Sequence, residues 1–295
     1  MWQCPACGAA ITVERRSAHR KHWCPALDDN DDDAPAPEAS RTPAAAAPSL
    51  SFATAPASTS TTHARVASIG LDLEFACQSI FGAVSTGGAL WRSELVLAEW
   101  CARELRLGAI GAHTRAPRVL ELGCGVAPAA GMTCLALGAA VHFTDLAEVL
   151  PFVEANVRLN GDRISTLRAR AGHAPLSRSS CDTEAYRFGR QSAASASQSR
   201  LASLARAPRG FDLILASDCI FRSDLHTPLA QTLRQLFDYD AAGRGSRPIS
   251  QVRCIVAFRY REAADLEFFT DALPREGLVA TCLKVFFSFS FRFLI

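Results

Sequence analysis

The chain has 295 residues, of which 49% are hydrophobic and 20% are charged, so it is long enough and apolar enough to form a sizeable core. Its formal net charge of +2 argues neither for nor against a nucleic-acid partner. No apolar run reaches the roughly 18 residues of a membrane span, and the N-terminus lacks the apolar core of a secretory signal, so no membrane span is expected. Most of the 11 cysteines are scattered singly through apolar runs, which is typical of reduced, buried thiols in an intracellular protein, so we expect the cytoplasm or the nucleus.

The first 24 residues carry a dense cluster of cysteine and histidine. A Cys-x-x-Cys pair is followed by a basic segment that can form a helix and supply a histidine and a cysteine, which is the spacing of a structural zinc site. We predict a zinc finger over residues 1–24, in which so short a segment would take its folding energy from the metal. The predicted Zn²⁺ ligands are Cys4, Cys7, His19 and Cys24, with His22 as an alternative fourth ligand. The basic helix is expected to contact protein or nucleic acid, with protein favoured.

Residues 25–65 have the composition of a linker. They are rich in Asp, Ala, Pro, Ser and Thr and contain few large apolar side chains, so they cannot bury enough surface to fold. We therefore predict a disordered tether between the zinc finger and the rest of the chain.

Residues 66–295 show the patterning of one α/β domain. Ser93 is expected to cap a helix that runs to Leu107, and a Ser/Arg/Ala-rich stretch at about 173–209 is predicted to be a surface insertion. The repeated order of strand and helix predicts a doubly wound, mostly parallel sheet. The expected strands are 118–122, 139–144, 211–217 and 251–258, the expected helices are 146–159 and 262–273, and the alternating residues 285–295 could supply a seventh strand.

A glycine turn ends the first strand of this sheet. Gly123 and Gly125 form a Gly-x-Gly pair there, and Asp145 follows at the end of the next strand. Glycine allows the backbone to turn tightly and approach a ligand. A carboxylate at the end of the next strand can accept hydrogen bonds from ribose hydroxyls. Dinucleotide sites and S-adenosylmethionine sites share these features.

Two details favour S-adenosylmethionine. Pro128 stands where a dinucleotide fingerprint has its third glycine. That glycine permits close helix packing beside a pyrophosphate, and S-adenosylmethionine has no pyrophosphate. Glu121 lies two residues before Gly123, and a carboxylate there suits a ligand with a sulfonium and an ammonium group better than one with phosphates.

Five blocks of the sequence match one family when they are taken together and in order: residues 85–98, 120–125, 138–145, 156–160 and 211–221. They resemble the family 16 methyltransferases, a group of seven-β-strand enzymes that includes protein-lysine methyltransferases. The resemblance implies a methyltransferase fold, S-adenosyl-L-methionine as cofactor, a protein substrate, and transfer to a lysine amine. We expect a monomer.

The resemblance also implies roles for individual residues. Asp218 would begin the family's Asp-x-x-Tyr motif near the substrate amine, where it could orient the amine and offset its charge, and Phe221 takes the place of the Tyr. Asp218 could alternatively cap the helix that follows it. The family's Trp after the third strand, near the adenine, has no counterpart between Arg163 and Phe211. The implied cofactor-binding residues are Trp91, Glu121, Gly123, Cys124, Gly125, Asp145 and Ser217.

Four functions remain open at this point. Lysine methylation of a protein comes first, and arginine methylation second because Phe221 removes a hydroxyl from the substrate channel. A methyltransferase of small molecules or nucleic acids is third, and base methylation is disfavoured because residues 218–221 lack the prolines and the stacking Tyr of base-modifying enzymes. The fourth is a zinc-finger binding protein whose methyltransferase-like domain is inactive.

Overall fold

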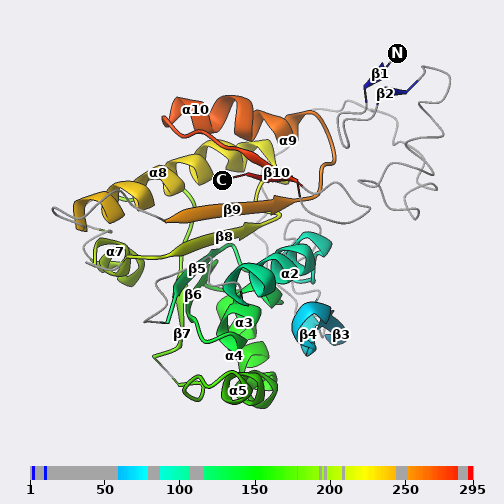
Figure 1. Ribbon diagram of the computed structural model, residues 1–295. Coiled ribbons are helices and arrows are strands. Elements are labelled where there is room, and N and C mark those ends of the chain that lie inside the picture. The colour runs from blue at the N-terminus through cyan, green and yellow to red at the C-terminus, as the bar shows by residue number, and fades with distance from the viewer. Residues whose placement is uncertain are drawn as a thin grey trace, which may run out of the picture. The chain divides into compact units, whose positions relative to one another are not determined.

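Figure 1 shows the computed structural model of the chain, which forms two units, one of residues 1–58 with 287–290 and one of residues 59–286 with 291–295. The structure describes residues 59–78, 87–106, 116–177, 179–192, 195, 198–207, 210–243 and 252–284, together with short strands at Trp2–Gln3, Ala10–Ile11 and Arg292–Leu294.

The larger unit is built on a sheet that has seven strands within the described ranges, in the order β10-β11-β9-β8-β5-β6-β7 (Figure 1). The strands β7, β6, β5, β8 and β9 pair in parallel, and β11 is antiparallel to both of its neighbours. The mostly parallel, doubly wound sheet is thus confirmed, and β11 lies in the C-terminal stretch that was expected to supply a seventh strand. The bounds are β5 Arg118–Leu122, β6 Ala140–Asp145, β7 Cys181–Ala185, β8 Leu213–Ser217, β9 Arg253–Phe258, β10 Cys282–Lys284 and β11 Arg292–Leu294.

Helices cover both faces of the sheet (Figure 1). On one face lie α2 Arg92–Arg106, α3 Ala129–Ala136, α4 Leu150–Leu159 and α5 Gly161–Arg170. On the other lie α7 Arg200–Arg206, α8 His226–Gly243, and a continuous run of α9 Ala264–Glu267, the π-helix Phe268–Ala272 and α10 Leu273–Arg275. Successive side chains of β5 alternate between the two layers, so that Val119 packs with α2 and α3 while Leu120 and Leu122 pack with α8.

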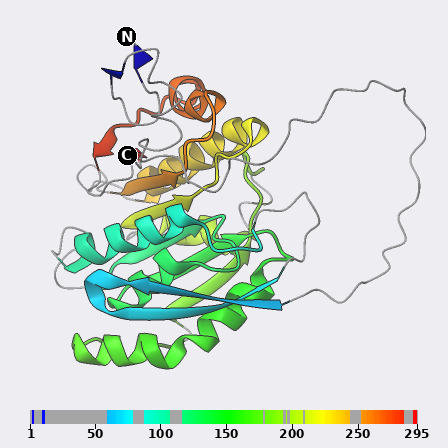
Figure 2. The ribbon, with the colours of Figure 1, turned by 90° about the vertical axis from the view of Figure 1, so that its right-hand side faces the viewer.

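Two long strands precede this sheet in the chain. Strand β3, Thr59–Val66, pairs with β4, Leu71–Gln78, and Gly70 closes the turn in the left-handed region with φ of 64°. The inward-facing side chains, among them Leu73 and Phe75, are buried. The hairpin lies beside α2 and α5 (Figure 2). It begins at Thr59, so seven residues that we expected in the linker belong to a strand, because the Thr-rich sequence of β3 conceals its alternation.

Three further expectations differ from the structure. Strand β7 lies inside the stretch 173–209 that was predicted to be a surface insertion, because its Cys-Asp-Thr-Glu-Ala sequence lacks the apolar run of a buried strand. The helix predicted for 146–159 starts later, at Leu150, but it ends at Leu159 as expected, and a further helix, α5, begins at Gly161. The last helical run, which was expected to end before Pro274, continues through this residue to Arg275.

Two buried asparagines of the α4–α5 junction attach the hairpin to the sheet. Asn156 accepts a hydrogen bond from the Ala76 N–H at 2.8 Å and donates to the carbonyls of Ala76 at 3.1 Å and Val126 at 2.7 Å. Asn160 pairs in the same way with the N–H and carbonyl of Glu74, at 2.9 and 2.7 Å. The two amides satisfy the free edge of β4, and Asn156 also connects it to the residue that follows the glycine turn.

In the N-terminal unit, β1 and β2 form a short antiparallel ladder in which Trp2 faces Ile11. The predicted zinc ligands Cys4, Cys7, His19 and Cys24 lie outside the described residues. Within the described part of the chain, no cluster of three His, Cys, Asp or Glu side chains is arranged to bind a metal. None of the helices described there is both long enough and apolar enough to cross a membrane.

The asparagine bridge predicts a specific loss of stability. Asn156 is 1% exposed, and Asn156→Ala leaves the buried Val126 carbonyl and the part-buried N–H and carbonyl of Ala76 without this partner. A buried group that loses its partner costs about 1–3 kcal/mol, and the part-buried groups of Ala76 cost less because water can reach them. We expect urea unfolding to show a loss of about 2–4 kcal/mol. Arg158→Ala on the same helix, whose side chain is 72% exposed, is the matched control and should lose under about 0.5 kcal/mol. Equal losses in the two variants would contradict the bridge.

Candidate active site

The parallel strands deliver their C-terminal residues to one edge of the sheet, which is where ligands bind in doubly wound folds. The glycine turn follows β5, Asp145 ends β6, Tyr186 follows β7, and Ser217 and Asp218 stand at the end of β8. The structure therefore brings most of the residues selected from the sequence to one edge.

The glycine turn depends on glycine at both positions. Gly123 and Gly125 each have φ of 59°, in the left-handed region. A Cβ at Gly123 would lie 2.8 Å from the Cys219 sulfur and 3.0 Å from the Phe188 ring, and one at Gly125 would lie 3.3 Å from the Gly87 carbonyl oxygen. Gly87 is held in place because its carbonyl accepts a hydrogen bond from the Val126 N–H at 2.8 Å. Larger side chains would therefore disrupt both the turn and the segment that passes over it.

Asp145 lies directly against this turn. Its Oδ2 accepts a hydrogen bond from the Gly125 N–H at 2.7 Å, and its Oδ1 accepts one from the Leu146 N–H at 2.7 Å. Burial raises the pKa of the Asp145 carboxyl, and these two amides partly oppose that rise. The structure thus joins the turn and the acid that the sequence placed at neighbouring strand ends. Cys124, between the two glycines, is buried and donates its N–H to the Thr144 carbonyl at 3.1 Å.

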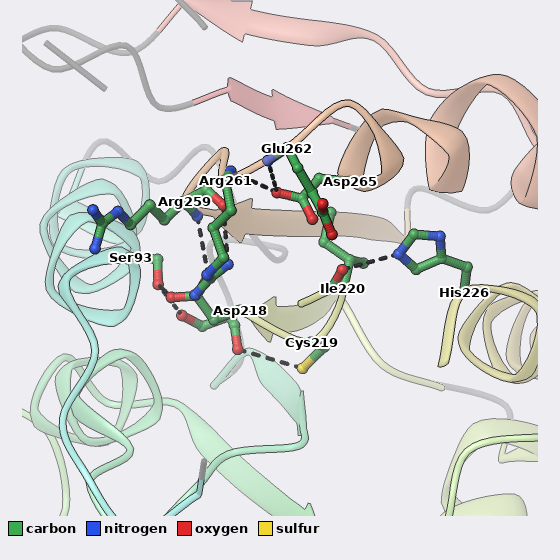
Figure 3. A network of polar contacts seen from close by, with 10 residues as sticks. Ser93, Asp218, Cys219, Ile220, His226, Arg259, Arg261, Glu262 and Asp265 are labelled. Carbon is green, nitrogen blue, oxygen red and sulfur yellow. Dashed lines mark hydrogen bonds and ion pairs between the residues drawn. The ribbon is translucent and has the colours of Figure 1, made fainter. Parts of the chain in front are cut away.

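A second polar cluster surrounds Asp218 (Figure 3). This residue is 7% exposed and has φ of 50°, a conformation that is costly for a residue with a side chain. Its Oδ1 accepts hydrogen bonds from the Arg259 N–H at 3.0 Å and from Arg261 Nη1 at 3.1 Å, while its Oδ2 accepts from the Ser93 hydroxyl. Ser217 donates in turn to the Ser93 oxygen at 3.2 Å.

This cluster changes two expectations. Ser93 was predicted to cap α2, but it is the second residue of that helix and its hydroxyl donates to Asp218. Asp218 was given a helix cap as its alternative role, yet its carboxylate binds groups from α2 and from the segment after β9 rather than the amides that follow it. Asp218 is therefore anchored by the protein itself, with an ion pair to Arg261.

Two other carboxyl groups, those of Glu121 and Glu94, are buried close to each other near the glycine turn. Glu121 was expected to face the ligand, but it is 0% exposed and points beneath α3, where a Cβ on Gly131 would clash with its Oε2. Burial raises its pKa well above the ordinary value, and the neighbouring charge of Glu94 adds to the rise. Glu94 accepts a hydrogen bond from the Ala130 N–H at 2.6 Å, and burial raises its pKa to about 7. The Glu121 side chain thus lies within the core beneath α3.

Aromatic side chains that sequence analysis missed stand near the turn. Tyr186 donates its backbone N–H to the Asp145 carbonyl at 2.8 Å, and the Phe188 ring approaches Gly123. They follow β7, on the side where the family was expected to place a Trp. The available signal was Tyr186 and Phe188 themselves, but β7 was not recognised as a strand. Trp91 lies with its ring centroid 5.7 Å from the Arg261 guanidinium carbon. Phe221 is partly exposed three residues beyond Asp218, and its role stays a prediction.

Comparison with known proteins gives one strong match. The sequence profile of a family described as lysine methyltransferase matches residues 73–174 and 198–274, which is 179 of 295 residues, or about three fifths of the chain. The unmatched gap, 175–197, falls within the predicted insertion. Among curated proteins, none matches the chain.

Solved structures with similar folds are distant. A SAM-dependent methyltransferase from Agrobacterium tumefaciens is 12% identical with a TM-score of 0.43, over 79% of this chain and 69% of that one. A 16S rRNA methyltransferase from T. thermophilus is 16% identical with a TM-score of 0.41, over 80% of this chain and 49% of that one. A ribosomal protein L11 methylase from Lactobacillus delbrueckii subsp. bulgaricus is 15% identical with a TM-score of 0.38, over 73% and 89%. At these values the likenesses carry no argument about the reaction or the substrate.

The buried acids predict a pH dependence of stability. The pKa of Glu94 is about 7 in the folded protein, above its ordinary value of 4.5. The contribution of this group to the free energy of unfolding is therefore greatest below pH 4.5 and is lost as the pH rises toward 7. Glu94→Gln keeps an oxygen for the Ala130 N–H but cannot ionise. We expect it to remove about 2–3 kcal/mol of the decline in unfolding free energy between pH 5 and 8.

The matched control is Glu154→Gln, since Glu154 is a glutamate on the surface of α4 with a 49% exposed side chain. Its stability should follow the wild-type pH curve. If Glu94→Gln also declines in parallel with the wild type, Glu94 does not titrate as its surroundings require.

Proposed function

The chain belongs to the lysine methyltransferase family, and from this premise we propose that it transfers the methyl group of S-adenosyl-L-methionine to a lysine side chain of a protein substrate. Membership of the family makes the protein a methyltransferase enzyme. The observation that best supports the finer proposal is the hydrogen bond between Gly125 and Asp145, because it unites a tight turn and a carboxylate at the edge where such a ligand would bind.

The residues present suit S-adenosylmethionine. Gly123 and Gly125 have no Cβ, which allows the backbone of the turn to approach a ligand closely, and Asp145 offers a carboxylate with lone pairs beyond the two that the backbone uses. We propose that Trp91, Gly123, Cys124, Gly125, Asp145 and Ser217 hold this group, with Asp145 accepting from ribose hydroxyls. Glu121 is not part of this set, because it is buried beneath α3.

When bound, S-adenosylmethionine supplies a methyl group on a good leaving group, so little acid catalysis is required. The protein's task is then to align the acceptor nitrogen and exclude water. A lysine amine has a free pKa of about 10.4 and must lose a proton before it can attack. We propose that Asp218 orients this amine, from a position that Ser93, Arg259 and Arg261 determine. The proton passes to solvent.

Lysine is proposed as the acceptor, and arginine is the alternative. The family match supports lysine, whereas Phe221 in place of a tyrosine removes a hydroxyl that could bind the acceptor. We propose that the enzyme acts as a monomer on a protein in the cytoplasm or the nucleus.

A labelling experiment tests this proposal. The purified chain, tritiated S-adenosylmethionine and a total cell extract should give label in protein, recovered as methyl-lysine after hydrolysis. Asp145→Ala should lower cofactor affinity at least about tenfold in a calorimetric titration, because a carboxylate's charge-assisted hydrogen bonds contribute about 1.5–3 kcal/mol.

Each other outcome has a definite meaning. Label in methylarginine would show that arginine is the acceptor in place of lysine. Label confined to RNA or small molecules would overturn the proposal that the substrate is a protein. Failure of the wild-type chain to bind the cofactor at all would favour a binding protein without activity.

We also propose that residues 1–24 bind one structural Zn²⁺ through Cys4, Cys7, His19 and Cys24. The support is the ligand spacing in the sequence, together with the pairing of β1 with β2 on either side of residues 4–9. This segment is proposed to contact protein partners, with nucleic acid as the alternative.

Metal analysis tests the zinc proposal in the full-length protein. We expect one Zn²⁺ per chain, and none in a Cys4→Ser, Cys7→Ser double variant. Cys254→Ser, in β9 of the other unit, is the control and should keep the metal. A wild-type chain that binds no zinc would remove this assignment without affecting the methyltransferase domain.

A further inference from the structure

We propose that Arg261 is a positioning residue that balances the charge of Asp218, so that the incoming amine can release its proton near neutral pH. This inference rests on the proposed function, since it concerns how the acceptor of that reaction is prepared. It assigns a role to a residue that sequence analysis did not single out.

Arg261 is anchored from several directions (Figure 3). Its Nη1 donates to Asp218 Oδ1 at 3.1 Å and to the Arg259 carbonyl at 3.0 Å, and its backbone N–H donates to Asp265 Oδ2 at 2.6 Å. Trp91 covers the guanidinium at 5.7 Å, within the range of a cation–π contact. The side chain is only 29% exposed. The positive charge is therefore held beside Asp218 by contacts with the end of β9, the start of α9 and the segment before α2.

The pairing matters because Asp218 is almost fully buried. A carboxylate without a counter-ion in such a place would strongly favour any cation that came close, and would raise the pKa of a nearby ammonium. An ammonium cannot attack a methyl group, so this effect would oppose the reaction. With Arg261 in place the pair is close to neutral, and Asp218 can orient the amine by a hydrogen bond without retaining its proton.

The other charged and titratable groups around Asp218 leave this role to Arg261. From α2 comes Glu94, a buried acid whose charge would add to that of Asp218. Burial raises the pKa of the Cys219 thiol, so it stays neutral. Asp265 is engaged by the N–H groups of Arg261 and Glu262, at 2.6 and 3.3 Å. Arg259 contributes its backbone N–H to Asp218, and Glu262 has an exposed side chain.

The test compares two substitutions that separate charge from geometry. Arg261→Gln removes the charge, and Arg261→Lys keeps it. Initial rates of tritiated methyl transfer to a dilute total protein extract are measured from pH 6 to 10. We expect the acid limb of the Arg261→Gln profile to move up by about one pH unit, so that transfer is about tenfold slower at pH 7 and recovers toward the wild-type rate near pH 10. Arg261→Lys should keep the wild-type limb.

Two controls complete the design. Cofactor titration of each variant shows that the fold and the glycine turn are intact. The comparison is repeated in a Glu94→Gln background, in which the shift should persist because it does not come from Glu94.

The inference fails if Arg261→Gln is slower by the same factor at every pH, or if Arg261→Lys shifts the profile as far as Arg261→Gln does. Either result would give Arg261 a purely geometric role. Absence of transfer by the wild-type protein would instead overturn the proposed function, so the two failures are distinguishable.

Discussion

The structure depends on the contact between the β5 turn and the end of β6. Parallel pairing of β5 with β6 brings Leu122 opposite Thr144, and the chain then turns so that the Gly125 N–H reaches the Asp145 carboxylate. Neither group could be moved by one residue without losing the bond, because the register of the two strands sets the distance between them. The turn, the helix α3 that follows it and the proposed cofactor site all take their position from this contact.

Around that contact the protein concentrates polar groups that globular proteins otherwise keep apart. Glu94 and Glu121 are buried close to each other, and Asp218 is buried in contact with Arg261 and Ser93, to which Ser217 is also bonded. Burying charged groups costs stability unless they are paired or protonated. Buried acids at the edge where parallel strands end are consistent with the site proposed there. The same residues connect α2, β5 and β8, so the residues around the proposed site also hold these elements together.

Much of this arrangement could be predicted from the sequence, because the signals were local. The apolar runs of β5, β8 and β9 predicted the sheet, and the glycines after β5 predicted the edge at which the proposed site lies. Strand β7 was not predicted because an edge strand needs no apolar run. Tyr186 and Phe188, which follow it, were therefore not predicted either. The hairpin β3–β4 was missed in part because its fold relies on Asn156 and Asn160, some 80 residues away. Glu121 was expected to face the ligand but lies in the core, because the sequence does not show that α3 covers its face of β5. The partner of Asp218 could not be foreseen either, because Arg261 reaches it from beyond β9.

The most direct test of the central claim is a crystal structure of the full-length protein grown with S-adenosylhomocysteine. We expect the homocysteine portion to lie over residues 123–125, with both ribose hydroxyls donating hydrogen bonds to the Asp145 carboxylate. A ligand bound elsewhere, or a ribose that leaves Asp145 on its backbone amides alone, would contradict it.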